Sequence, residues 1–280
     1  MNKRRQRFET ETAHLPSPSL SLSLSLSDVD AALARALLYN VLALGFRAPT
    51  EETTARLFSD ESAAALRAAG ALLEERAGRP IAPATRALGA IGGASAAELS
   101  SSHRRLFGHT ARGLVPPYET EYGVEALFQQ SLELADLAGF YRAFGLAVNA
   151  AERERADHVS CECEFLSFLA LKEAYALENG EPAMLEETRK AARLFLRDHL
   201  ARFAPAFSRK LARDDRDGFY GRLGELCRSL VEMECVRLGV PAGPENLALR
   251  PANDERVPMA CGAEGGCPVF PGGAAPDGTD

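Results

Sequence analysis

Six cysteines and five histidines are the side chains of this 280-residue chain that could support metal or redox chemistry. Cys261 and Cys267 stand in the glycine-rich stretch CGAEGGC, where both sulfurs could reach one ion. A structural zinc site needs two further ligands, and the surrounding tail contains no histidine. The pair is therefore an incomplete metal site, and a metal or redox role for it stays open.

The other four cysteines fit a protein core better than a site. Cys161 and Cys163 are two residues apart on an expected helix, so their side chains point about 200° apart. Cys227 and Cys235 lie about 12 Å apart along another expected helix, which is too far for one ion. The scattered thiols do not form a disulfide scaffold, and a reducing compartment is the simpler interpretation.

The histidines do not assemble a recognisable catalytic motif. Asp157 can cap the helix that follows it, which would leave His158 as an exposed first-turn residue. His103 and His109 flank a loop rich in glycine and proline, with no serine or cysteine nucleophile in a recognisable turn nearby. The chain also lacks the glycine-rich phosphate-binding patterns of nucleotide sites.

The composition is that of a globular chain able to bury a core, with 46% hydrophobic and 25% charged residues. The formal net charge of −7, from 32 basic and 39 acidic residues, argues against nucleic acid as the main partner. No stretch approaches the roughly 20 uninterrupted apolar residues of a membrane helix. We therefore expect neither nucleic-acid binding nor membrane insertion.

The two ends differ from the middle of the chain. Residues 1–27 begin with the basic stretch MNKRRQRF and continue as a serine/leucine alternation, which predicts a low-complexity, disordered leader. Arg4-Arg5 followed by Phe8 weakly resembles an export signal, but no apolar core and no clear cleavage site follow. Residues 241–280 are rich in proline and glycine, which predicts an extended or disordered tail.

The middle, residues 28–240, predicts a single all-α domain, because apolar residues recur at helical spacing and no convincing strand pattern occurs. The helix near 157–178 is apolar around most of its circumference and should be the central one. Asp28 is a candidate cap of the first helix, and Pro205 is expected to restart the chain after the sixth. The expected helices are 28–45, 51–77, 94–107, one through 127–144, 157–178, 181–203 and 217–238.

The loop after the third expected helix is the most unusual local feature. Its two consecutive prolines fix an extended backbone, and the flanking aromatic residues would form a rigid apolar wall. Such a wall is either core or the lip of a peptide-binding groove, and periodicity alone favours core. The residues concerned are Leu106, Phe107, Val115, Pro116, Pro117, Tyr118, Glu119 and Tyr122.

Three stretches together resemble one family, the TorD/DmsD/NarJ-type maturation chaperones of redox enzymes. LFGHTARGLVPPYETEY is similar to that family's "LF…PPYESxY" signature. Residues 154–158, ERADH, followed by Cys163-Glu164-Phe165, are similar to its E-x-P-D-H signature and acidic-apolar helix. FLRDHLARFAPAF, residues 195–207, is similar to its third stretch. The order and spacing fit over about residues 30–240. The chain differs at Ala156, where the family has proline, at Phe203, where tryptophan is common, and at His103, an often aromatic position.

The resemblance implies a cytoplasmic, all-helical chaperone of the TorD-like type, with no catalysis and no cofactor of its own. Its partner would be the apo catalytic subunit of a molybdopterin enzyme of the dimethyl-sulfoxide-reductase superfamily, including the twin-arginine signal peptide. Such a peptide is basic and then apolar, which suits an acidic surface beside an apolar groove. Chaperones of this kind can also exchange helices in a homodimer.

The resemblance also implies two binding surfaces. The first comprises Leu106, Phe107, Pro117, Tyr118, Glu119 and Tyr122. The second comprises Glu154, Asp157 and His158, whose carboxylates could pair with the arginines of the signal peptide. Two other functions stay open: a metal- or redox-active protein that uses Cys261 and Cys267, and a persistent accessory subunit of the enzyme complex.

Overall fold

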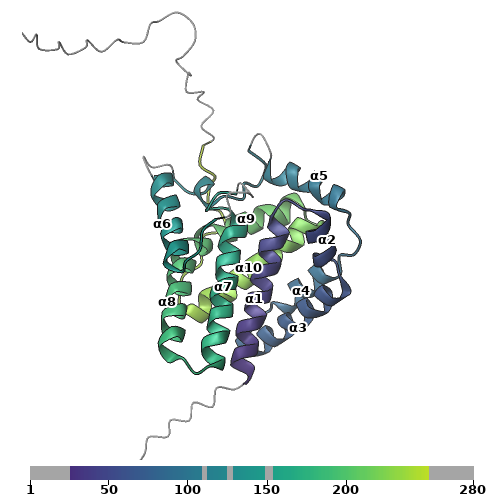
Figure 1. Cartoon of the computed structure of the whole chain (residues 1–280). Coiled ribbons are helices and arrows are strands. Elements are labelled where there is room, and N and C mark those ends of the chain that lie inside the picture. Colours follow the sequence, from purple (N-terminus) through teal and green to yellow (C-terminus); the bar gives the residue numbers. More distant parts are fainter. Residues whose placement is uncertain (1–25, 109–111, 125–128, 149–153, 252–280) are drawn as a thin grey trace, which may run out of the picture.

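The computed structural model describes residues 26–108, 112–124, 129–148 and 154–251 (Figure 1). These residues form ten α-helices and one 3-10 turn with no strand among them, so the predicted all-α fold is confirmed. The helices are α1 (Leu26–Phe46), α2 (Glu51–Leu57), α3 (Asp60–Ala77), α4 (Ala82–Gly89), α5 (Ala96–Phe107), α6 (Gln129–Ala143), α7 (Val159–Glu178), α8 (Pro182–Asp198), α9 (Leu200–Asp214) and α10 (Phe219–Leu238), and the 3-10 turn η1 is Glu119–Glu121.

Helix α7 lies between α1 and α8 in Figure 1 and is buried along most of its length, as the sequence predicts for a central helix. The contact between α7 and α1 is the most extensive contact between two helices of the described residues. Helices α3 and α4 pack against each other, and α3 also packs against α1. Helices α9 and α10 form a second close pair, and α10 contacts α1, α4 and α8. One continuous hydrophobic core connects these layers.

Local capping explains where the first helices depart from the sequence prediction. The stretch expected as one helix over 51–77 is two, because the Ser59 side chain accepts a hydrogen bond from the Ser62 N–H and so begins α3. Thr50 caps α2 in the same way through the N–H of Thr53. Asp28 lies inside the first turn of α1 and is not its cap. Helix α4, with a proline in its first turn, was not expected from the sequence.

Pro205 lies inside α9, which corrects the prediction that it restarts the chain; the break between α8 and α9 is at His199. A proline cannot donate to the carbonyl four residues earlier, here that of Ala201. The backbone N–H of Gly243 donates to that carbonyl instead, at 2.8 Å. A Cβ atom on Gly243 would lie 2.1 Å from the carbonyl oxygen of Arg202, so this replacement donor requires glycine.

The segment after α10 packs on the helices up to residue 251. The N–H of Gly123 donates to Ala248, and the N–H of Arg250 donates to Glu121, both at 2.8 Å. The side chain of Arg250, which belongs to this segment, is buried. The first part of the expected tail therefore belongs to the packed structure, whereas Cys261 and Cys267 lie outside the described residues, as does most of the expected leader.

Helix α1 combines a length and hydropathy that would also suit a membrane span. Its window from Asp28 to Phe46 has a mean hydropathy of 1.4, and 67% of it is buried inside the molecule. Asp28, Asp30, Arg35 and Asn40 interrupt this window, so it does not form an uninterrupted apolar run in the sequence. Burial against α7 and α3 accounts for the apolar character of α1.

The contact between α3 and α4 allows a test of the packing. A Cβ atom on Gly70 would lie 2.1 Å from Oγ1 of Thr85, whose hydroxyl donates to the Ala82 carbonyl. We expect Gly70→Ala to lower the free energy of unfolding by about 1–3 kcal/mol, measured by urea denaturation. Adding Thr85→Ala should recover most of the loss. Gly139→Ala in α6 is the control, because nothing lies within 4 Å of its Cβ position. Equal effects at Gly70 and Gly139 would contradict this account.

Candidate functional site

The proline-containing loop is hydrogen-bonded to the beginning of α7. The N–H of Val159 donates to the carbonyl of Pro117 at 2.8 Å, and the N–H of Glu119 donates to the carbonyl of Asp157 at 2.9 Å. Tyr118 and His158 form an isolated bridge between these two segments. The first two stretches of the sequence resemblance therefore meet at one place.

The buried side chain of Asp157 connects the loop to the beginning of α7 through hydrogen bonds. Its side chain is fully buried, and one carboxylate oxygen accepts hydrogen bonds from the N–H and the hydroxyl of Thr120, at 3.2 and 2.7 Å. The guanidinium of Arg155 donates to both carboxylate oxygens, at 2.8 and 3.0 Å. The Asp157 carboxylate is thus occupied by internal donors.

His158, and not Asp157, caps α7, and its side chain is buried where the sequence interpretation had it exposed. Nδ1 accepts a hydrogen bond from the Ser160 N–H at 3.1 Å, and the ring packs edge-on against Tyr118. Burial, together with the smaller effects of the nearby charges of His103, Arg47 and Arg155, lowers the pKa of His158 to about 3. The imidazole is therefore neutral at physiological pH.

Glu119 connects the third stretch of the resemblance to the first. Its buried carboxylate lies 3.0 Å from Nδ1 of His199 and accepts a hydrogen bond from Arg202 at 3.1 Å. Burial raises the pKa of Glu119, and the hydrogen bond and charge of His199 oppose that rise. Arg202 also reaches Glu133, which pairs with the buried Arg250. The three stretches thus form one internal polar network at the junction of α6, α8, α9 and η1.

Most residues predicted for binding are core residues. Only Tyr118 and Glu154 are partly exposed. The guanidinium carbon of Arg155 lies 4.5 Å from the centroid of the Tyr118 ring. The interpretation of the apolar wall as core, which periodicity favoured, therefore agrees with its burial. That a partner contacts the buried members of the predicted binding surfaces stays a prediction. The buried members are Leu106, Phe107, Pro117, Glu119, Tyr122, Asp157 and His158.

Glu162 is a buried acidic residue that the sequence analysis did not single out. Neither of its carboxylate oxygens has a hydrogen-bond partner among the described residues. Burial raises its pKa well above the usual range, and the charges of Glu119 and Asp157 add to this effect. It lies three and four residues from apolar positions of the same helix face, a spacing that could have indicated its burial.

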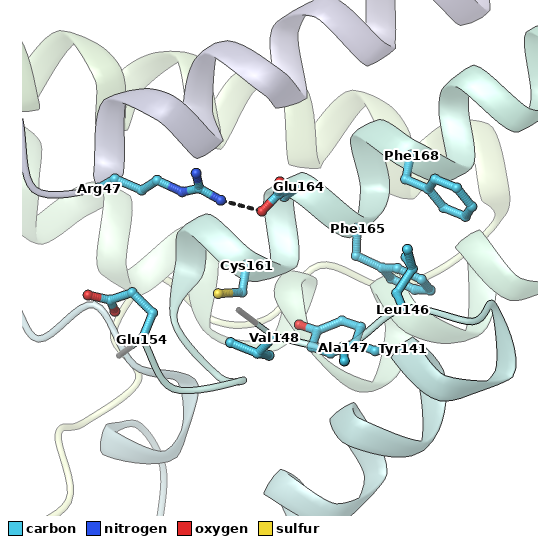
Figure 2. Close-up of a pocket in the computed structure, with 10 residues that line it drawn as sticks. All are labelled: Arg47, Tyr141, Leu146, Ala147, Val148, Glu154, Cys161, Glu164, Phe165 and Phe168. Atoms are coloured by element: carbon cyan, nitrogen blue, oxygen red, sulfur yellow. Dashed lines mark hydrogen bonds and ion pairs between the residues drawn. The ribbon is translucent and has the colours of Figure 1, made fainter. Parts of the chain in front are cut away.

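An open pocket of about 360 Å³ lies between the end of α1, the loop after α6 and the first half of α7 (Figure 2). Arg47 and Glu164, which form an ion pair, line one side of it. Glu154 and Cys161 lie near the beginning of α7. The remaining lining is mostly apolar and comprises Tyr141, Leu146, Ala147, Val148, Phe165 and Phe168.

The pocket combines an apolar wall with two carboxylates and one guanidinium at its rim, an arrangement suited to binding an amphipathic segment. Burial raises the pKa of the Cys161 thiol to about 12, so this thiol is not poised as a nucleophile. Among the described residues, no group of three or more histidine, cysteine or acidic side chains could hold a metal ion. Of the pocket residues, the sequence analysis had named only Glu154 as a site residue.

Comparison with known proteins agrees with the motifs. The family model described as nitrate reductase delta subunit matches residues 59–209. The chain is 34% identical over 157 residues to the selenate reductase assembly chaperone protein of Thauera selenatis, covering 48% of this chain and 79% of that protein. It is 30% identical over 213 residues to the perchlorate reductase assembly chaperone protein of Dechloromonas aromatica, and this match covers 73% of this chain and 89% of that protein. It is also 26% identical over 139 residues to the chaperone protein TorD of Vibrio cholerae, and this match covers 49% of this chain and 60% of that protein. The chain therefore belongs to the nitrate reductase delta subunit family, to which its TorD-like motifs and its helical fold correspond.

Proposed function

We propose that this protein is an assembly chaperone for a molybdopterin-containing reductase. It binds the apo catalytic subunit in the cytoplasm, before export, and releases it once the cofactor is inserted. The relatives named for selenate and perchlorate reductase assembly support this role. The role requires binding and release, and needs no catalytic group or cofactor of the chaperone's own.

The pocket beside α1 and α7 is the observation that supports binding of the precursor's twin-arginine signal peptide. Such a peptide brings a guanidinium-rich segment followed by an apolar one. Glu154 and Glu164 offer carboxylates at the rim, and Phe165 and Phe168 offer apolar surface behind them. The net charge of −7 would steer a basic peptide toward the protein.

In this proposal the carboxylates that pair with the peptide are Glu154 and Glu164, and not Asp157 or Glu119 of the predicted surfaces. Asp157 and Glu119 are held by internal donors, so they position the loop and α7 and do not pair with the peptide. Glu154 keeps its predicted role, because its side chain is 28% exposed at the pocket. Glu164 joins it, because its side chain is 58% exposed even though it pairs with Arg47, so a peptide guanidinium can share this carboxylate with Arg47.

The test is a titration of a labelled synthetic twin-arginine signal peptide of a molybdopterin reductase against the full-length protein, followed by fluorescence anisotropy. We expect Glu154→Gln combined with Glu164→Gln to weaken binding about tenfold, which corresponds to about 1.4 kcal/mol. Glu187→Gln on α8 is the matched control, because it removes an exposed carboxylate that does not line the pocket.

Two results would speak against this site. The first is equal affinity in the double variant and the control. The second is undiminished binding of a peptide whose two arginines are replaced by glutamine, because the rim carboxylates would then have no role in recognition.

A further inference from the structure

An apolar surface stripe follows the seam between α1 and α7. Leu33 of α1 is 45% exposed, and Leu171 and Tyr175 of α7 are 51% and 53% exposed. The two helices are held in register where the Ser167 hydroxyl donates to the Ala36 carbonyl at 2.8 Å. Leu37 and Phe168, both partly buried, extend the stripe toward the pocket. About half of the surface of Leu33, Leu171 and Tyr175 is left uncovered by the rest of the described residues.

The stripe connects the point where α1 begins with the pocket. Helix α1 has 21 residues and is therefore about 31 Å long. It begins at Leu26 and ends beside Arg47, which lines the pocket (Figure 2). Residues 1–25 precede this helix, and 25 extended residues can span about 80 Å. The preceding segment is thus long enough to follow the stripe back to the pocket.

The chemistry of residues 1–25 matches both parts of this surface. Its second half alternates serine and leucine, and an extended backbone would place Leu20, Leu22 and Leu24 on one side, as an apolar stripe requires. Its first half contains the sequence KRRQR at residues 3–7, with four positive charges. These charges complement Glu154 and Glu164 at the rim of the pocket.

We propose that residues 1–25 dock in cis on the α1/α7 stripe, with the basic segment at the pocket, and thereby compete with the precursor's signal peptide. The leucines pack against Leu33, Leu171 and Tyr175. Because the segment is tethered to α1, its effective concentration at the pocket is in the millimolar range, so even weak docking competes. The competition rests on the proposed function, whereas the docking itself does not.

Docking can be measured without any client. The chain contains no tryptophan, so Leu22→Trp creates a single fluorescent reporter in the full-length protein. We expect blue-shifted emission and severalfold protection from acrylamide quenching. Adding Leu171→Asp should abolish both effects. Adding Leu132→Asp should not, because Leu132 is a comparably exposed leucine, at 68%, on α6. Circular dichroism verifies that each variant is folded.

Two fluorescence results would overturn the proposal. One is solvent-like emission of the reporter that Leu171→Asp leaves unchanged. The other is protection that disappears on dilution, because the stripe would then be covered by a second copy of the chain.

Competition is measured with the synthetic signal peptide. Arg4→Gln combined with Arg5→Gln should raise the peptide's affinity for the full-length protein about three- to tenfold, and added peptide should expose the Leu22→Trp reporter. A protected reporter with unchanged peptide affinity would overturn the competition. A free reporter together with tight peptide binding would overturn the docking and leave the proposed function intact. Absence of peptide binding to every variant would count against the proposed function alone.

Discussion

Asp157→Ala is expected to lower the free energy of unfolding by about 2–3 kcal/mol. The fully buried carboxylate accepts hydrogen bonds from Thr120 and Arg155, and its removal leaves the buried Thr120 N–H without its acceptor. The loop around η1 would lose its attachment to the beginning of α7. Denaturant unfolding, followed by circular dichroism at 222 nm, measures the effect.

Two comparison variants make the expected loss specific to Asp157. Asp157→Asn retains an acceptor for Thr120 but not the charge that Arg155 needs, so its loss should lie between those of wild type and alanine. Glu187→Ala removes a carboxylate that is 73% exposed and should change stability by less than about 0.5 kcal/mol. A loss of less than 1 kcal/mol for Asp157→Ala would show that the network does not hold the loop.

Stability is expected to fall steeply in acid because of His158. Its pKa is about 3 in the folded protein and about 6.5 in an unfolded chain. The unfolded chain therefore binds a proton that the folded protein does not, and stability is lost as the pH falls from about 6.5 toward 3. By pH 4 this difference corresponds to about 3 kcal/mol.

His158→Asn isolates this contribution, because asparagine can cap α7 but does not titrate. Between pH 7 and pH 4, the variant should lose about 3 kcal/mol less unfolding free energy than the wild type, measured in matched urea series. Parallel losses in the two proteins would mean that another group accounts for the acid sensitivity.

The sequence was informative wherever one local pattern decides a structure. The apolar circumference of the helix near 157–178 correctly predicted the central position of α7. The expected ends of two helices, at residues 178 and 238, coincide with the observed ends of α7 and α10. Interactions between residues far apart in the sequence could not be predicted from local patterns. The Gly243 N–H compensates for Pro205 across 38 residues, so the usual expectation that proline ends a helix failed.

The candidate site was predictable only in part, for the same reason. The resemblance implied two separate surfaces, whereas Glu119 and Asp157 join their stretches at one junction. The resemblance assigned Glu119 and Asp157 to surfaces that bind a partner, whereas inside the structure Arg202, Thr120 and Arg155 donate hydrogen bonds to these two carboxylates. The pocket was missed because its residues come from the ends of α1 and α6 and from α7, and each is unremarkable in its own segment.

The most direct measurement of the central claim is affinity capture of the tagged full-length protein from its native host, with mass spectrometry and molybdenum analysis of the captured proteins. The chaperone role predicts a molybdoenzyme catalytic subunit that retains its signal peptide and lacks molybdenum. Its amount should fall when Glu154 and Glu164 are both replaced by glutamine. Capture of the mature, molybdenum-loaded enzyme alone would contradict this role and identify a persistent accessory subunit. Capture of no molybdoenzyme from cells that express one would contradict both.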